Sequence, residues 1–310
     1  MSAFNNKLHS AASMNRSLVC VGLDFDPALM PPALASNGDM RAFNRAIVDA
    51  TKDLVCAYKP NIAFYEALGI EGLQLLHDTI AHIRETAPGV VLLGDAKRGD
   101  IGSTSVKYAA AMFDYWGFDA VTVNGYMGGD SLAPFLDYAD KGVFVLCRTS
   151  NLGAREFQDI IVSVNADGSE SAAAPAYGQE MPLYEWIAAR ASEWNANGNI
   201  GLVLGATSPD QIGVIRRRCP GMPILIPGIG AQGGELESSV KNGIDRHNGG
   251  VYDEGGAVGD RVPPNILINS ARGIIYADRS AGGFADGARA AAMRLRDAIN
   301  DVLANEGVSW

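Results

Sequence analysis

Eight short apolar runs alternate along this chain with segments that carry the 3.6-residue period of an amphipathic helix. Continuous apolar runs of this length are typical of parallel strands that are buried on both faces. The runs are Leu18–Leu23, Cys56–Lys59, Val90–Gly94, Ala120–Val123, Val143–Cys147, Ile200–Leu204, Met222–Ile226 and Ile266–Ile268. The helical segments are Met40–Leu54, Gly72–Arg84, Thr104–Trp116, Leu132–Tyr138, Leu183–Asn195, Pro209–Arg217, Leu236–Asn242 and Ala288–Leu303. The alternation predicts a parallel sheet covered by helices.

Eight strand–helix units predict an α/β fold of the (β/α)8 TIM-barrel type, in a single domain over residues 1–310. An open doubly wound sheet is the alternative, but no G-x-G-x-x-G motif follows the first run. Residues 158–179 and 245–264 do not fit a minimal barrel and are expected to form long loops.

Charge and cysteine usage narrow the classes of partner. The formal net charge of −10 disfavours nucleic acid as the main partner. The chain contains no apolar stretch of about 18 residues, which disfavours a membrane span, and its start lacks the apolar core of a signal peptide. Four scattered cysteines form no C-x-x-C pair, which disfavours a disulfide framework or a zinc site. Cys20, Cys56 and Cys147 lie in or beside apolar runs, so we expect them to be buried thiols, in a reducing cytoplasm.

A cluster of opposite charges follows the second and third runs. Asp95 and Lys97 are two residues apart, so on a strand they share one face. Lys59 ends the neighbouring run, and Asp100 lies just beyond the third. In a barrel these residues meet at the carboxyl ends of the strands, where active sites lie. The array could present a proton and an anion to one substrate carbon, but a structural ion-pair network remains an equal alternative.

A second candidate site follows the last two runs. Gly228, Gly230 and the Gln232-Gly-Gly segment free backbone N–H groups to approach an anion. Arg272 adds a guanidinium suited to phosphate. These positions are the usual phosphate-binding place in such barrels, so we expect a phosphate site here.

Histidine and metal chemistry are disfavoured. None of the four histidines, His9, His77, His82 and His247, follows an apolar run. Magnesium on Asp95 or Asp100 stays open, although Lys97 competes for the same carboxylates. The Arg216-Arg217-Arg218 run is interpreted as a solvated helix face.

Residues 95–104, which read DAKRGDIGST, resemble the D-x-K-x-x-D-I-x-x-T signature of orotidine 5′-phosphate decarboxylase. The resemblance continues in GLD at 22–24, YKP at 58–60, PGIGAQGG at 227–234 and SARGI at 270–274. It therefore covers nearly the whole chain. The RTSN segment at 148–151 and the greater length are similar to the longer bacterial subgroup, type 2.

The resemblance implies a (β/α)8 barrel that forms a homodimer and needs neither cofactor nor metal. The implied reaction is decarboxylation of orotidine 5′-monophosphate to uridine 5′-monophosphate and CO2, the last step of de novo pyrimidine biosynthesis. Lys59, Asp95, Lys97 and Asp100 are the implied catalytic residues. Asp100 and Thr104 are expected to reach into the neighbouring subunit's site.

Further residues carry over as substrate contacts. Asp24 and Lys59 are expected to hold the ribose hydroxyls, Gln232 and Arg272 the phosphate, and Ser150 the pyrimidine. Asp95 would disfavour the substrate carboxylate in the ground state. Lys97 would stabilise the charge developing at C6 and then protonate that carbon.

Three rival functions stay open. A metal-dependent, aldolase-like enzyme of the same superfamily would act on a sugar phosphate and require magnesium. A binder of phosphate ligands would keep the barrel without turnover. A purely structural barrel has no obvious use for the polar strand ends.

Overall fold

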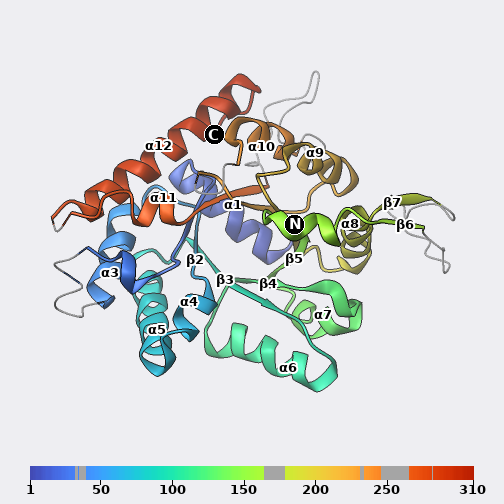
Figure 1. Cartoon of the computed structure of the whole chain (residues 1–310), viewed down its shortest axis with the longest axis horizontal. Coiled ribbons are helices and arrows are strands. Elements are labelled where there is room, and N and C mark those ends of the chain that lie inside the picture. The colour runs from blue at the N-terminus through green and yellow to red at the C-terminus, as the bar shows by residue number, and fades with distance from the viewer. Residues whose placement is uncertain (32–33, 35–39, 164–178, 231–233, 246–264, 281) are drawn as a thin grey trace.

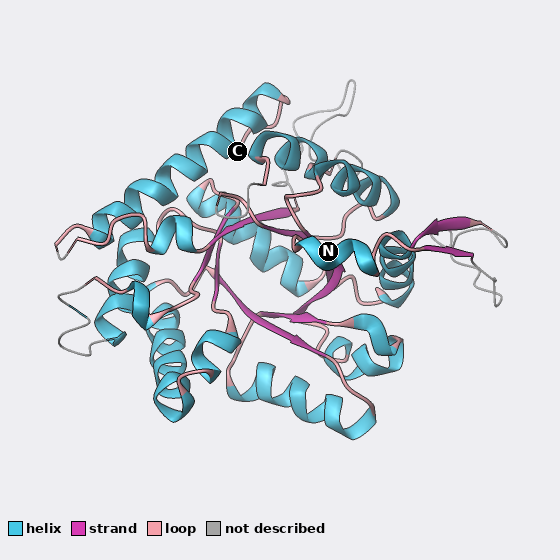
Figure 2. Cartoon of the chain, viewed as in Figure 1, coloured by secondary structure: helices cyan, strands magenta, loops and turns pink. Residues whose placement is uncertain are grey.

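The computed structural model describes residues 1–310 apart from 32–33, 35–39, 164–178, 231–233, 246–264 and 281. Eight parallel strands close into a barrel in the order β1-β10-β9-β8-β5-β4-β3-β2, which confirms the predicted (β/α)8 fold (Figures 1 and 2). The strands are β1 (Val19–Gly22), β2 (Ala57–Lys59), β3 (Val91–Arg98), β4 (Ala120–Val123), β5 (Gly142–Arg148), β8 (Ile200–Leu204), β9 (Ile224–Pro227) and β10 (Ile266–Ser270).

Helices surround the barrel. Eight of the described helices fall on the predicted segments, with ends shifted by a few residues, and three were not predicted. The helices are α1 (Ala3–Asn15), α3 (Met40–Thr51), α4 (Ile62–Glu66), α5 (Gly69–Thr86), α6 (Gly102–Ala110), α7 (Gly129–Leu136), α8 (Leu183–Trp194), α9 (Pro209–Arg218), α10 (Leu236–Gly243), α11 (Arg272–Ile275) and α12 (Phe284–Asn305). One predicted helix, Thr104–Trp116, is divided, because a π-helical turn at Ala111–Tyr115 follows α6.

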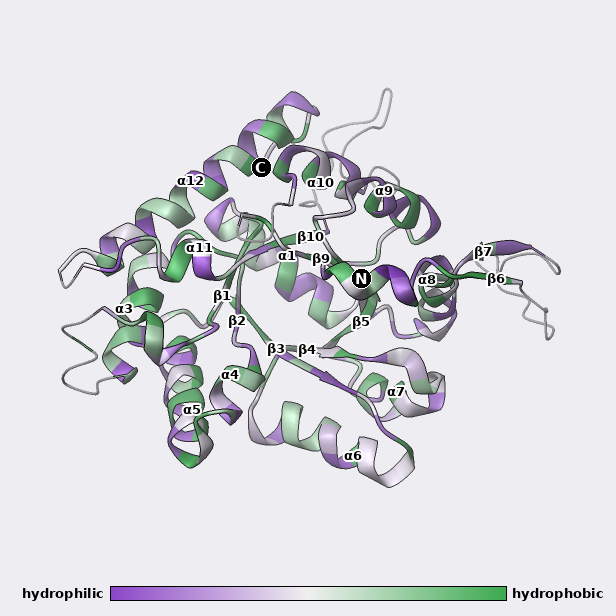
Figure 3. Cartoon of the chain, in the orientation of Figure 1, coloured by the Kyte–Doolittle hydropathy of each residue, from purple (hydrophilic) through white to green (hydrophobic). Residues whose placement is uncertain are grey.

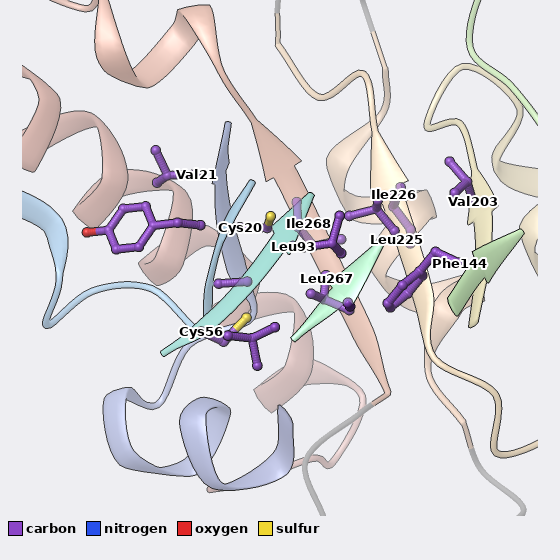
Figure 4. Close-up of a cluster of buried hydrophobic side chains, with 14 of the residues drawn as sticks. Cys20, Val21, Cys56, Leu93, Phe144, Val203, Leu225, Ile226, Leu267 and Ile268 are labelled. Carbon is purple, nitrogen blue, oxygen red and sulfur yellow. The ribbon is translucent and has the colours of Figure 1, made fainter. Parts of the chain in front are cut away.

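Apolar side chains from all around the barrel fill its interior. Figure 4 shows Cys20, Leu93, Phe144, Val203, Leu225 and Leu267 among this cluster, and all are buried. The strands are correspondingly hydrophobic in Figure 3, whereas the helices carry hydrophilic outer faces. Phe144 packs against Gly201, where an added Cβ would lie 2.5 Å from the ring. Cys20, Cys56 and Cys147 are buried free thiols, as expected, and Cys219 is one as well.

Helix α1, which the sequence did not predict, contacts residues that immediately precede several strands. Lys7 forms a 2.6 Å ion pair with Asp119, one residue before β4. His9 hydrogen-bonds Asn265, one residue before β10. Phe4 packs edge-on against Phe144, with ring centroids 5.8 Å apart. The helix therefore covers the amino end of the barrel and leaves the carboxyl end for the site.

Two expectations need correction. Residues 158–179 were expected to form a loop, but β6 (Ile161–Ser163) pairs there antiparallel with β7 (Glu180–Pro182). This two-stranded sheet projects from the side of the barrel (Figure 1). In the other expected loop, 245–264, Asp245 is buried and the remainder lies outside the described residues.

Arg216 is the second correction, because it is buried rather than solvated. Its guanidinium donates to the carbonyl oxygens of Gly243 at 2.8 Å, Met222 at 2.7 Å and Asn265 at 2.9 Å. Burial lowers the pKa of Arg216 to about 10. The Asn265 carbonyl oxygen also accepts from the Ile224 N–H, so Arg216 matters most for the buried carbonyl groups of Gly243 and Met222. Hydrogen bonds to these backbone acceptors explain a cation in the interior. Separately, the described helices include none long and apolar enough to cross a membrane.

Candidate active site

A cavity of about 490 Å³ opens at the carboxyl ends of the barrel strands. Its walls come from β1, β2, β3, β4, β5, β8, β9 and β10 or the residues that follow them. The lining includes Asp24, Lys59, Asn61, Asp95, Lys97, Thr122, Ser150, Gln158, Gly228, Asn269 and Arg272. Most residues that the sequence analysis singled out at strand ends therefore share one cavity.

Asp95 is the centre of the charged array. Its Oδ2 accepts a hydrogen bond from Lys59 Nζ at 2.8 Å. Its Oδ1 accepts from Lys97 Nζ at 2.6 Å and from Thr122 Oγ1 at 2.9 Å. Both carboxylate oxygens are thus held in fixed directions, between two lysines from neighbouring strands.

The two lysines differ in exposure and in backbone conformation. The Lys59 side chain is 4% exposed, whereas that of Lys97 is 48% exposed. Lys97 has φ of +49°, a left-handed conformation that is uncommon for a residue other than glycine. Its N–H donates to Thr122 Oγ1 at 3.0 Å. Backbone strain held by a specific contact is typical of functional positions, and here it accompanies an ammonium group on the cavity wall.

The charges of the array stabilise one another. Burial alone would raise the pKa of Asp95, but Lys59 and Lys97 outweigh it and hold that pKa well below its usual range. Burial would lower the pKa of Lys59, but Asp95 and Asp24 raise it above its ordinary value. Asp95 is therefore an anion, and Lys59 a cation, at neutral pH.

Asp24 has a different environment. Its Oδ1 lies 3.9 Å from Lys59 Nζ, beyond hydrogen-bond distance. This oxygen is buried and has no hydrogen-bond partner among the described residues. Burial raises the pKa of Asp24, although Lys59 opposes the shift. Asn269 Oδ1 on the same cavity wall is also buried without a partner in the described part of the chain. Both oxygens are free to accept hydrogen bonds from a ligand.

The segments expected to bind phosphate follow β9 and β10 in the chain. Gly228 and Gly230 have φ of +102° and +83°, conformations that glycine adopts without strain. Pro227, Gly228 and Arg272 line the cavity. Gln232, the other residue expected at the phosphate, lies outside the described residues.

Two expected residues are absent from the cavity of their own chain. Asp100 and Thr104 do not line it. The Asp100 carboxylate instead accepts from the backbone N–H of Ile101 at 2.7 Å, and Thr104 is exposed on α6. The second carboxylate beside Lys59 is Asp24, so the expectation that spacing brings Asp100 into this array is wrong within a single chain.

Comparison with known proteins places this geometry in a family. The family model described as "Orotidine 5'-phosphate decarboxylase / HUMPS family" matches residues 17–258. A protein named orotidine 5′-phosphate decarboxylase from Roseiflexus castenholzii is 46% identical over 302 residues, 97% of this chain and 98% of the relative. The chain belongs to the orotidine 5′-phosphate decarboxylase family.

Other members agree in sequence and structure. The orotidine 5′-phosphate decarboxylase of Dehalococcoides mccartyi is 45% identical over 297 residues, 96% of this chain and 97% of that protein. The structure of Leishmania donovani OMP decarboxylase has a TM-score of 0.73 at 35% identity, covering 97% of this chain and 99% of that one. Leishmania donovani UMP synthase has a TM-score of 0.76 at 37% identity, and the match covers 57% of its chain.

Several polar residues of the cavity, among them Thr122, Asn269 and Gln158, were given no role in the sequence analysis. Thr122 lies within a strand, where threonine is common for reasons of β-propensity alone. Asn269 is the next-to-last residue of β10, three positions before the more conspicuous Arg272. Gln158 enters the wall because the chain returns to the barrel after β5. The position of Asn269 at a strand end was a usable signal, whereas Gln158 offered none.

Proposed function

We propose that this member of the family decarboxylates orotidine 5′-monophosphate to uridine 5′-monophosphate and CO2, as an enzyme of pyrimidine biosynthesis. The observation that carries the proposal is the Lys59–Asp95–Lys97 array, with distances of 2.8 and 2.6 Å, on the wall of a cavity that also contains Arg272. It unites a fixed anion, a protonated amine and a phosphate partner in one nucleotide-sized space. Family membership supports the same substrate.

The nucleotide is proposed to lie across the cavity. Its phosphate binds at Arg272, with Gln232 as a further partner. Its ribose hydroxyls donate to Asp24, whose Oδ1 is free of partners in the described structure, and contact Lys59. Its pyrimidine faces Ser150, which lines the same cavity. Binding of the remote phosphate thereby contributes to the orientation of the reacting carbon.

The reaction is proposed to proceed by direct loss of CO2. Asp95, held as an anion by its two lysines, lies beside the substrate carboxylate and disfavours it. The C6–carboxyl bond breaks, CO2 leaves, and the electron pair remains on C6. The Lys97 ammonium stabilises that charge and transfers a proton to C6. This scheme uses side chains alone, so we propose that no metal or cofactor takes part.

The proposal includes a homodimer in which Asp100 and Thr104 serve the neighbouring subunit's site. Both residues lie off the cavity of their own chain. Large apolar side chains nearby are exposed, including Ile101 at 62% and Val106 at 50%. Such exposure beside a polar site is typical of an interaction surface. Buried free thiols support a reducing, cytoplasmic location.

Product analysis tests the proposed reaction. Incubation with orotidine 5′-monophosphate is expected to yield uridine 5′-monophosphate and CO2 in equal amounts, separated by chromatography and by CO2 trapping. Cleavage of a sugar phosphate with magnesium, and none of the nucleotide, would instead identify the aldolase-like rival. Tight nucleotide binding without product would identify a binding protein.

A further inference from the structure

The segment after β5 is held by a side chain from further along the chain. Gln158 Oε1 accepts a hydrogen bond from the Thr149 backbone N–H at 2.8 Å, and Gln158 Nε2 donates to Thr149 Oγ1 at 2.8 Å. The Thr149 hydroxyl in turn donates to Asn151 Oδ1 at 2.7 Å. Gln158 therefore holds Thr149 directly and Asn151 through the Thr149 hydroxyl, and these two residues flank Ser150.

Gln158 is itself firmly anchored. The neighbouring Asp159 forms a 3.0 Å ion pair with Arg148, whose side chain is 4% exposed. The Gln158 carbonyl oxygen accepts from the Tyr184 N–H at 3.0 Å, where α8 begins. Two separate attachments thus connect the Gln158 backbone to β5 and α8, so its amide approaches Thr149 from a rigid support.

Ser150 is constrained from the opposite side as well. A Cβ added to Gly205 would lie 2.7 Å from Ser150 Cα, so the two segments are in close contact. Thr207 Oγ1 donates to the Ser150 carbonyl oxygen at 3.3 Å. Ser150 lines the cavity, and its hydroxyl makes no hydrogen bond to another described residue. The surroundings fix the backbone of Ser150 and leave its hydroxyl available to a ligand.

We propose that Gln158 is a positioning residue that sets the Ser150 hydroxyl for recognition of the pyrimidine ring. This inference rests on the proposed function, because it takes the base to face Ser150. Gln158 acts through the Thr149 amide and hydroxyl rather than through the phosphate or ribose. Its effect is therefore specific to ligands that carry a base.

The test compares two ligands that share a phosphate and a ribose. Gln158→Leu keeps the side-chain volume and removes both hydrogen bonds. We expect the inhibition constant of uridine 5′-monophosphate to rise about tenfold, as for two lost hydrogen bonds, and that of ribose 5-phosphate to stay unchanged. Gln74→Leu, on the exposed face of α5, is the matched control and should alter neither. An equal rise in the inhibition constants of both ligands in Gln158→Leu would overturn the inference.

A double-mutant cycle tests whether Gln158 acts through Ser150. In Ser150→Ala, the added loss of kcat/KM from Gln158→Leu should largely vanish, because coupled residues are not additive. Additive losses would contradict the inference. If Gln158→Leu folds poorly, Thr149→Val takes its place, because it keeps the backbone N–H and removes the hydroxyl that Gln158 contacts. This variant should reproduce part of the effect. If the wild type binds uridine 5′-monophosphate but releases no CO2 from orotidine 5′-monophosphate, the proposed function fails. The comparison of the two ligands still decides the role of Gln158 in that case.

Discussion

At the scale of single residues, the candidate site depends on contacts that hold Asp95 and Lys97 in one arrangement. Thr122 Oγ1 accepts from the Lys97 N–H and donates to Asp95 Oδ1. One hydroxyl therefore connects the strained backbone of the lysine to the carboxylate beside it. The charged residues were predictable, because their spacing places them on one face at a strand end. Their connection through Thr122 was not, since it depends on register between β3 and β4.

Replacement of Lys97 by alanine removes the proposed proton donor. We expect kcat to fall by several powers of ten, each tenfold loss corresponding to about 1.4 kcal/mol in the barrier. Steady-state turnover of orotidine 5′-monophosphate measures kcat of both proteins. Lys241→Ala, which replaces an exposed lysine on α10, is the control and should keep wild-type kcat. A near-normal kcat in Lys97→Ala would exclude the proposed role.

The low pKa of Asp95 predicts an acid dependence of stability. An aspartate in the unfolded chain has a pKa of about 3.9. Near this pH the folded protein binds fewer protons at Asp95 than the unfolded chain does. The free energy of unfolding therefore falls as the pH drops through this value. From pH 5 to 3, the wild type should lose about 1 kcal/mol more unfolding free energy than Asp95→Asn. Urea denaturation at both pH values measures the difference. Parallel changes in the two proteins would contradict the ion-pair account.

At the scale of elements, the strand–helix alternation was predictable and the accessory elements were not. All eight barrel strands fall on predicted apolar runs. Helix α1 escaped prediction because it covers one end of the barrel rather than continuing the alternation. Strands β6 and β7 were missed because they are only three residues long and flank a serine- and alanine-rich stretch that is typical of a loop. Arg216 was misread because a run of arginines is usually solvated, and only tertiary contacts reveal its backbone acceptors.

Arg216 joins α9 to the segments before β9 and β10. Arg216→Met removes the guanidinium that donates to the buried carbonyl groups of Gly243 and Met222, which should destabilise the fold by about 3 kcal/mol. Chemical denaturation measures this loss. Arg217→Met, at the exposed neighbouring position, should change stability by less than about 0.5 kcal/mol. Equal stability of the two variants would show that the Arg216 contacts contribute little.

At the scale of the whole molecule, one chain supplies only part of the expected site. Asp24, Lys59, Asp95, Lys97, Ser150 and Arg272 line a common cavity, whereas Asp100 and Thr104 do not. The spacing of residues along the sequence cannot show whether a side chain lines the cavity of its own chain or that of a neighbouring subunit. The direction in which a short segment leaves its strand decides that, and this is a property of the folded chain.

Mixed dimers test the shared site. Lys97→Ala and Asp100→Ala are each expected to be inactive, but a heterodimer contains one site with native Lys97 and native Asp100. Co-expression should therefore recover about a quarter of wild-type activity, as random pairing in a twofold dimer requires. Lys97→Ala with Asp95→Ala, two residues of the same cavity, should recover none. Absence of recovery in the first pair would place Asp100 in its own subunit's site.

The most direct test of the central proposal is turnover of orotidine 5′-monophosphate in the presence of EDTA, followed by ultraviolet absorbance. The Lys59–Asp95–Lys97 array is proposed to perform the reaction with side chains alone. We therefore predict rapid loss of the orotate absorbance, at a rate unchanged by the chelator. Absence of turnover in EDTA, together with magnesium-dependent cleavage of a sugar phosphate, would contradict the account.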